Sequence, residues 1–79
     1  MADDVLGLTG TVINAIRAKG TPGEILVAFR GGSETYVAHA DEPIALGESV
    51  LVIALRPGHQ VDVIHWPTDS VLRNGLLDT

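Results

Sequence analysis

The chain has 79 residues, which is enough for one folded domain with one modest core. Hydrophobic residues make up 46% of it, which is too large a share for a disordered tail. Ten acidic residues against five basic ones give a formal charge of −5, which is the wrong sign for following a phosphate backbone. There is no cysteine, so disulfides and thiolate metal sites are excluded.

The first predicted strand spans residues 8–17 and ends at the breaker segment 18–23. Gly10 lies inside this strand, where a bulge or a tight barrel bend would favour a residue without a side chain. Pro22 and Gly23 suit the middle of a type II turn, because proline presets φ and glycine accepts a positive φ. We therefore expect the chain to reverse at this pair.

The second predicted strand spans residues 24–30, and its apolar residues alternate with the others. The alternation places Ile25, Val27 and Phe29 on one face, which we expect to pack in the core. Gly31 and Gly32 follow, and this pair fits a two-residue hairpin turn of the primed type. A third strand over residues 34–40 should therefore pair antiparallel with the second.

The segment 41–47 is too short for a full helix, and it leads into a fourth predicted strand over residues 48–55. This strand is almost continuously apolar, which is typical of the centre of a core. Pro57 and Gly58 mark the next turn, and a fifth strand over residues 60–66 should point Val61 and Val63 inward.

The tail after Pro67 has candidate helix caps at Thr68, Asp69 and Ser70 and a stop signal at Asn74 and Gly75. It predicts at most one short helix, which is marginal in water by itself. Four apolar residues of this segment would pack onto the barrel, pack onto a neighbour, or fray: Val71, Leu72, Leu76 and Leu77.

Five short strands bounded by glycine and proline predict an all-β fold. We expect them to be antiparallel and to close into a barrel, because closure removes the exposed edges of an isolated five-stranded sheet.

Six short motifs occur in order along the chain and together resemble the soluble C-terminal domain of NfeD-like membrane proteins. They are Gly7-Leu8-Thr9-Gly10-Thr11-Val12, Pro22-Gly23-Glu24-Ile25, Tyr36-Val37-Ala38, Ile44-Ala45-Leu46-Gly47, Val50-Leu51-Val52 and Val61-Asp62-Val63. The resemblance implies a five-stranded OB-fold-like barrel that lacks the helix between the third and fourth strands. The expected organisation is an N-terminal extension over 1–6, the barrel over 7–66 and a C-terminal tail over 67–79.

The resemblance also implies a function. NfeD-like proteins usually carry this domain behind transmembrane helices and are linked to stomatin- or flotillin-like membrane scaffolds, and longer members add a serine-protease domain that this sequence does not contain. We therefore expect a soluble, non-catalytic protein-interaction module. It would be associated with a membrane through segments absent from this chain. Its role would be to work with such a scaffold or to regulate membrane proteolysis. Two departures affect the turns: Leu46 stands where relatives often have a basic residue, and the first turn is longer than usual.

Other chemistry finds little support in the residues. The histidines His39, His59 and His65 lack the spacing of a metal-ligand set, and no serine lies in a Gly-x-Ser-x-Gly elbow, so we expect no metal, no cofactor and no catalytic residue. Two alternatives remain open. One is an OB-fold nucleic-acid binder, disfavoured by charge, and the other is a biotinyl- or lipoyl-like carrier, whose arm would require Lys19 in a motif that is absent.

Strict alternation sends several apolar residues of the last two strands away from the core. They are Leu51, Ile53 and Leu55 on the fourth strand and Ile64 and Trp66 on the fifth. A contiguous exposed apolar area usually marks an interface. The predicted protein-interaction residues are Leu51, Ile53, Ile64 and Trp66, which would be covered by a protein partner, by a second copy of the chain, or by the tail 67–79.

Overall fold

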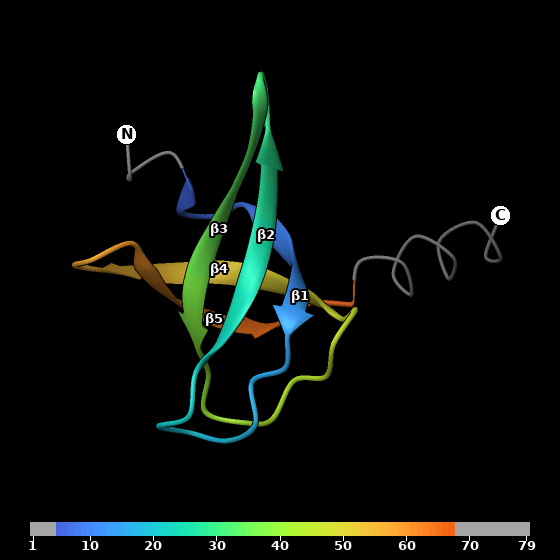
Figure 1. Ribbon diagram of the computed structural model, residues 1–79, viewed down its shortest axis with the longest axis vertical. Coiled ribbons are helices and arrows are strands. Elements are labelled where there is room, and N and C mark those ends of the chain that lie inside the picture. Colours follow the sequence, from blue (N-terminus) through green and yellow to red (C-terminus); the bar gives the residue numbers. More distant parts are fainter. Residues whose placement is uncertain (1–4, 68–79) are drawn as a thin grey trace, which may run out of the picture.

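A computed structural model describes residues 5–67 of the chain. Five strands close into a barrel in the order β1-β2-β3-β5-β4 (Figure 1). Their bounds are β1 Thr9–Asn14, β2 Gly23–Phe29, β3 Gly32–His39, β4 Ser49–Arg56 and β5 Gln60–His65. The all-β barrel is confirmed, as is the absence of a helix between β3 and β4. The predicted helix of the tail lies outside the described residues.

The barrel closes through one parallel pair, which corrects the expectation of five antiparallel strands. β3 and β5 run parallel, with Val37 opposite Gln60 and His39 opposite Asp62. The other four pairs, β1–β2, β2–β3, β1–β4 and β4–β5, are antiparallel. β3 and β4 are not neighbours in the barrel, and the connection between them crosses one end of it (Figure 1). β5 returns antiparallel to β4 and so runs beside β3 in the same direction.

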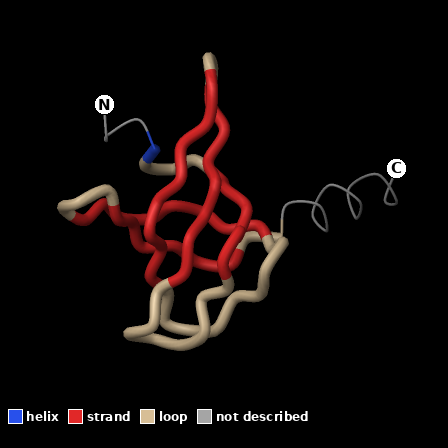
Figure 2. Tube along the Cα trace, in the orientation of Figure 1, coloured by secondary structure: helices blue, strands red, loops and turns tan. Residues whose placement is uncertain are grey.

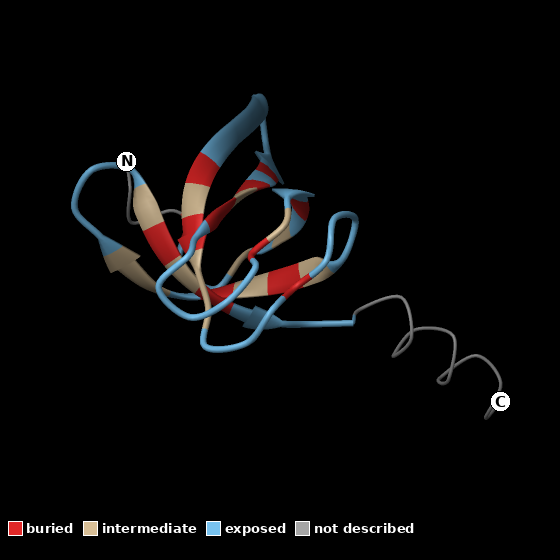
Figure 3. Ribbon diagram, turned by 60° about the horizontal axis from the view of Figure 1, so that its bottom comes forward, coloured by how far each residue is buried: buried red, intermediate tan, exposed pale blue. Residues whose placement is uncertain are grey.

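The core is made of side chains from all five strands and from three segments outside them. Figure 3 shows where the buried residues lie along the chain. Outside the strands, Ile16 and Ile44 are buried and form an isolated bridge to each other. Val5 is also buried, at 1% exposure, although the sequence places it in the N-terminal extension. No polar or charged residue is buried in the described chain. The buried set is Val5, Val12, Ile16, Ile25, Val27, Tyr36, Ala38, Ile44, Val50, Val52, Val61 and Val63.

The turn between β1 and β2 does not lie where the sequence predicts it. Thr21 N–H donates to Ala18 C=O at 2.9 Å, and Gly20 adopts φ +86°, so the chain reverses at Lys19 and Gly20. Gly23 is instead the first residue of β2 and has no positive φ. The proline-glycine pair therefore does not form the predicted turn.

The hairpin between β2 and β3 is present, but its turn comes one residue early. Phe29 pairs with Gly32, so Arg30 and Gly31 form the two-residue loop. Of these two residues, Gly31 has a positive φ, +92°, and Arg30 does not. A type I′ turn needs positive values at both central residues, and a type II′ turn needs one at the first. The predicted primed turn is therefore wrong.

This hairpin projects beyond the barrel as a two-stranded arm (Figures 1 and 2). β1 pairs with β2 only as far as Leu26, so the rest of β2 has β3 as its only strand neighbour in the described chain. Phe29 lies on this arm and is 40% exposed. The predicted core position of Phe29 is wrong, because the alternation continues past the end of the core.

A β-bulge in β4 changes the facing of its last residues. Val52 pairs with Val63 and Ala54 with Asp62, so Ile53 is an extra residue without a partner of its own. A bulge shifts the alternation by one position. Leu55 therefore packs against the core instead of facing outward as predicted, and Ile53 stays on the outside at 48% exposure.

His59 closes the turn between β4 and β5 in a left-handed conformation, with φ +64°. Its ring stacks on Tyr36, with centroids 4.3 Å apart and planes at 14°, and its Nε2 lies 3.0 Å from Glu34 Oε1. A non-glycine residue in this conformation is strained, so contacts must hold it there.

We expect His59→Ala to lower the free energy of unfolding by about 1–2 kcal/mol, because it removes the stacking and the hydrogen bond and keeps the strain. Urea unfolding followed by circular dichroism measures the change. His59→Gly should be less destabilised than His59→Ala, since glycine adopts this φ freely. Equal losses of unfolding free energy for His59→Ala and His59→Gly would contradict backbone strain at this position.

Candidate functional site

The predicted interaction residues come together on the outside of the barrel. Leu51 lies directly opposite Ile64 on the neighbouring strand, and Trp66 N–H donates to Ser49 C=O at 2.8 Å, so Trp66 continues the same face. Ile53, Ile64 and Trp66 are 48%, 42% and 41% exposed, and Leu51 is half-buried. We call this surface the β4–β5 face and define it as Leu51, Ile53, Ile64 and Trp66.

The β4–β5 face continues over two more strands that sequence reasoning did not include. Thr9 lies opposite Leu51, and Thr11 lies between Ser49 on β4 and Leu26 on β2. Leu26 is 39% exposed. None of these outward side chains is charged. Leu26, a large apolar residue on the outward side of β2, was the signal in the sequence that could have extended the face. The pairing of β1 with β4, which joins the strands of this face, could not be predicted from the sequence.

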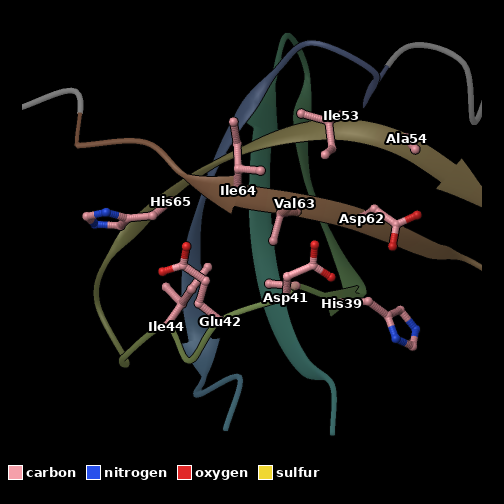
Figure 4. Close-up of a pocket in the computed structure, with 11 residues that line it drawn as sticks. His39, Asp41, Glu42, Ile44, Ile53, Ala54, Asp62, Val63, Ile64 and His65 are labelled. Carbon is pink, nitrogen blue, oxygen red and sulfur yellow. The ribbon is translucent and has the colours of Figure 1, made fainter. Parts of the chain in front are cut away.

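A groove of about 300 Å³ opens at one edge of the β4–β5 face (Figure 4). It lies between β5 and the segment 40–44 that follows β3. Apolar side chains in its lining include Ile44, Ile53 and Ile64, and three carboxylates also line it, from Asp41, Glu42 and Asp62. Two of the predicted interaction residues, Ile53 and Ile64, thus belong to a concave site.

The three carboxylates of the groove differ in how far they are neutralised. Asp62 Oδ1 lies 2.8 Å from Arg56 Nη2 and accepts a hydrogen bond from Arg56 Nε at 3.0 Å. The hydrogen bond to Asp62 raises the pKa of the Arg56 guanidinium above its ordinary value. Asp41 has only Lys19 Nζ at 4.0 Å, with both side chains more than three-quarters exposed, and such a pair contributes little. No ion pair involves Glu42 within residues 5–67. Asp41 and Glu42 therefore give the groove a negative rim.

The three histidines do not come together, and each contacts a different polar side chain. His39 and His65 lie at the groove, but each is bound elsewhere: His39 Nε2 is 2.8 Å from Gln60 Oε1, and His65 Nε2 is 2.8 Å from Glu48 Oε1. His59 lies on the turn described above, against Glu34. Across residues 5–67, no group of three or more metal-ligating side chains occurs.

Lys19, the residue that a carrier domain would require, lies in the turn between β1 and β2, with its side chain 80% exposed. It has the exposure of a carrier lysine, but its neighbours are Ala18 and Gly20, without a carrier motif.

Residues 9–64 match the family model of the NfeD C-terminal domain. The chain belongs to this family. The match covers more than half of the chain and contains all five strands except the last residue of β5. The resemblance seen in the six sequence motifs is thereby confirmed.

Two solved structures have the same fold as this NfeD C-terminal domain. One is the soluble domain of the NfeD protein YuaF from Bacillus subtilis, with a TM-score of 0.72 and 27% identity over 82% of this chain and 77% of that one. The other is the C-terminal domain of stomatin operon partner protein 1510-C from Pyrococcus horikoshii, with a TM-score of 0.65 and 28% identity over 84% of this chain and 94% of that one. No curated protein sequence gave a match.

Within residues 5–67, no helix has the length and apolar character needed for crossing a bilayer.

Proposed function

We propose that this NfeD C-terminal domain is a non-catalytic protein-interaction module that docks onto a stomatin- or flotillin-like membrane scaffold through the β4–β5 face. Segments outside this chain would hold it at the membrane, where the contact would organise the scaffold or regulate membrane proteolysis. The observation that supports the proposal most is the run of uncharged outward side chains over β1, β2, β4 and β5, which includes the exposed Ile53, Ile64 and Trp66.

The energetic reason is the cost of leaving these side chains in water. Full burial of one large apolar side chain contributes about 1.5–3 kcal/mol, so several of them on one face are a substantial share of a small domain's stability. A soluble domain with a contiguous apolar area of this kind usually has a partner for it. The name of one structural relative, a stomatin operon partner protein, supports a stomatin-like scaffold as that partner.

The alternative of nucleic-acid binding has no support from the site. The groove beside the β4–β5 face has a negative rim at Asp41 and Glu42, which would repel phosphates. Of the three aromatic residues, Tyr36 is buried beneath His59, while Phe29 and Trp66 lie on separate parts of the barrel. They do not form a stacking platform with basic neighbours.

The proposal is tested by the binding of a purified stomatin-like scaffold, taken from the genes that neighbour this one, to the 79-residue chain. We expect saturable binding by surface plasmon resonance. We also expect a chain that ends at Pro67 to bind equally and to keep the same melting temperature, because the partner and not the tail covers the β4–β5 face. A large fall in melting temperature on this truncation would show instead that residues 68–79 cover the face. Absence of binding by the intact chain would contradict the scaffold as partner.

A further inference from the structure

The barrel wall is open over the second half of β5. β5 pairs with β3 only from Gln60 to Asp62, because β3 ends at His39 and the chain then leaves the sheet as the segment 40–44. No backbone hydrogen bond joins residues 63–65 to that segment in the described part of the molecule. A short length of strand edge is therefore exposed in an otherwise closed barrel.

The peptide groups of this edge are directed into the groove. Trp66 N–H donates to Ser49 C=O, so the amide of Trp66 faces β4. The backbone groups of successive residues in an antiparallel strand face opposite sides, so those of Val63 and His65 face away from β4. The pairing of His39 with Asp62 engages the Val63 N–H, so the open groups of the edge are Val63 C=O and the N–H and C=O of His65. On that side lies the groove between β5 and the segment 40–44. An unpaired edge beside a groove is the arrangement on which an extended peptide adds as a further strand.

The side chains around the edge define the chemistry of the occupant. Ile53 and Ile64 offer an apolar surface on one side of β5, and Asp41 and Glu42 lie on the opposite wall (Figure 4). These two carboxylates are not neutralised by a close basic side chain, unlike Asp62. Charge complementarity therefore requires a basic residue in the occupant, next to an aliphatic one. The same two charges disfavour an anionic lipid surface.

We propose that the groove receives an extended segment of a protein partner, which adds as a short strand to β5 at residues 63–65. The segment places a lysine or arginine against Asp41 and Glu42 and an aliphatic side chain against Ile53 and Ile64. This inference rests on the interaction role proposed above and specifies which part of a partner the domain binds.

The test is a titration of the ¹⁵N-labelled 79-residue chain with the peptide acetyl-Lys-Ile-Lys-Val-Lys-amide, followed by NMR. Saturable shifts are expected for the amides of residues 63–65 and for Asp41 and Glu42. Two control peptides are expected to give no saturable shifts. One replaces each lysine by glutamate, and the other is methylated on its backbone nitrogens, which removes the donors that a strand needs. Equal binding of either control, or shifts confined to other parts of the barrel, would overturn the inference.

The carboxylates are tested with the double variant Asp41→Asn/Glu42→Gln. We expect about tenfold weaker peptide binding, as the loss of two exposed ion pairs implies, and a weaker dependence on salt. The matched control Glu24→Gln/Glu34→Gln removes the same charge from outside the groove and should bind the peptide like the original chain. Equal affinity of the two double variants would overturn the role of Asp41 and Glu42.

The inference and the proposed function can fail separately. Peptide binding to the groove without scaffold binding would support strand addition to β5 and count against the stomatin-like partner. Scaffold binding that is unaffected by an excess of the basic peptide and by Asp41→Asn/Glu42→Gln would support the docking role and overturn strand addition as its mode.

Discussion

Gly23→Ala is expected to lower the free energy of unfolding by about 4 kcal/mol, which is a large share of the stability of a small domain. A Cβ at this position would lie 2.1 Å from Asn14 C=O oxygen and 2.6 Å from Ala15 C=O oxygen. Both are backbone atoms, so no side-chain rotation relieves the clash. Either β1 or β2 would have to move away from the sheet. Urea unfolding monitored by circular dichroism measures the loss.

The control for Gly23→Ala is Gly20→Ala in the preceding turn. A Cβ at Gly20 meets nothing within 4 Å, so its cost comes only from the φ of +86°. A single residue in this conformation costs about 1–2 kcal/mol. A loss for Gly23→Ala that is no larger than the loss for Gly20→Ala would contradict the close approach of the two chains.

The close approach at Gly23 follows from an irregularity in β1. The register of β1 against β2 shifts between Val12 and Asn14, so the chain bends over the first residue of β2. The Asn14 side chain donates a hydrogen bond to the Glu24 carboxylate at this point and fixes the bend. The residue that the sequence suggests for a turn is therefore required for packing.

Ile53→Asp is expected to weaken scaffold binding by at least about thirtyfold, the loss typical of a residue at the centre of an interface. Ile53 is the extra residue of the β4 bulge and projects at the junction of the β4–β5 face and the groove. A carboxylate there would have to be desolvated on binding and would also add to the negative rim. Because Ile53 is already half exposed, the melting temperature should change by only a few degrees.

The matched control for Ile53→Asp is Leu46→Asp, an equivalent change at a side chain that is 67% exposed and lies outside the face and the groove. It should bind the scaffold like the original chain. Sedimentation of both variants and of the original chain reports whether a second copy is the partner instead. If Ile53→Asp changes neither stability nor any association, the β4–β5 face is not the functional surface.

Local pattern in the sequence is enough to determine the strands and most of the core. Period-two alternation identifies Val50, Val52, Val61 and Val63 as inward, and the structure buries all four. It also identifies Ile53, Ile64 and Trp66 as outward, and all three are exposed. These properties depend on residues one and two positions apart, and such spacing is present in the chain before it folds.

The sequence alone fails where a bulge or the end of a neighbouring strand interrupts the alternation. Leu55 turns inward because of the extra residue at Ile53, and Phe29 leaves the core because β2 extends beyond its pairing with β1. Both outcomes depend on which residues of another strand lie opposite. Sequence alternation excludes a slip of one residue, but it does not show where a bulge lies or where the pairing with a neighbouring strand ends.

The candidate site divides in the same way. The amino-acid sequence by itself determined that apolar residues would be left on the outside of β4 and β5. Only the tertiary structure decided that Thr9, Thr11 and Leu26 extend this face, and that Asp41 and Glu42 lie across a groove from Ile53 and Ile64. The reason is the parallel pairing of β3 with β5, which stops at His39 and Asp62. Contacts between segments more than twenty residues apart set that end point, and through it the open edge of β5.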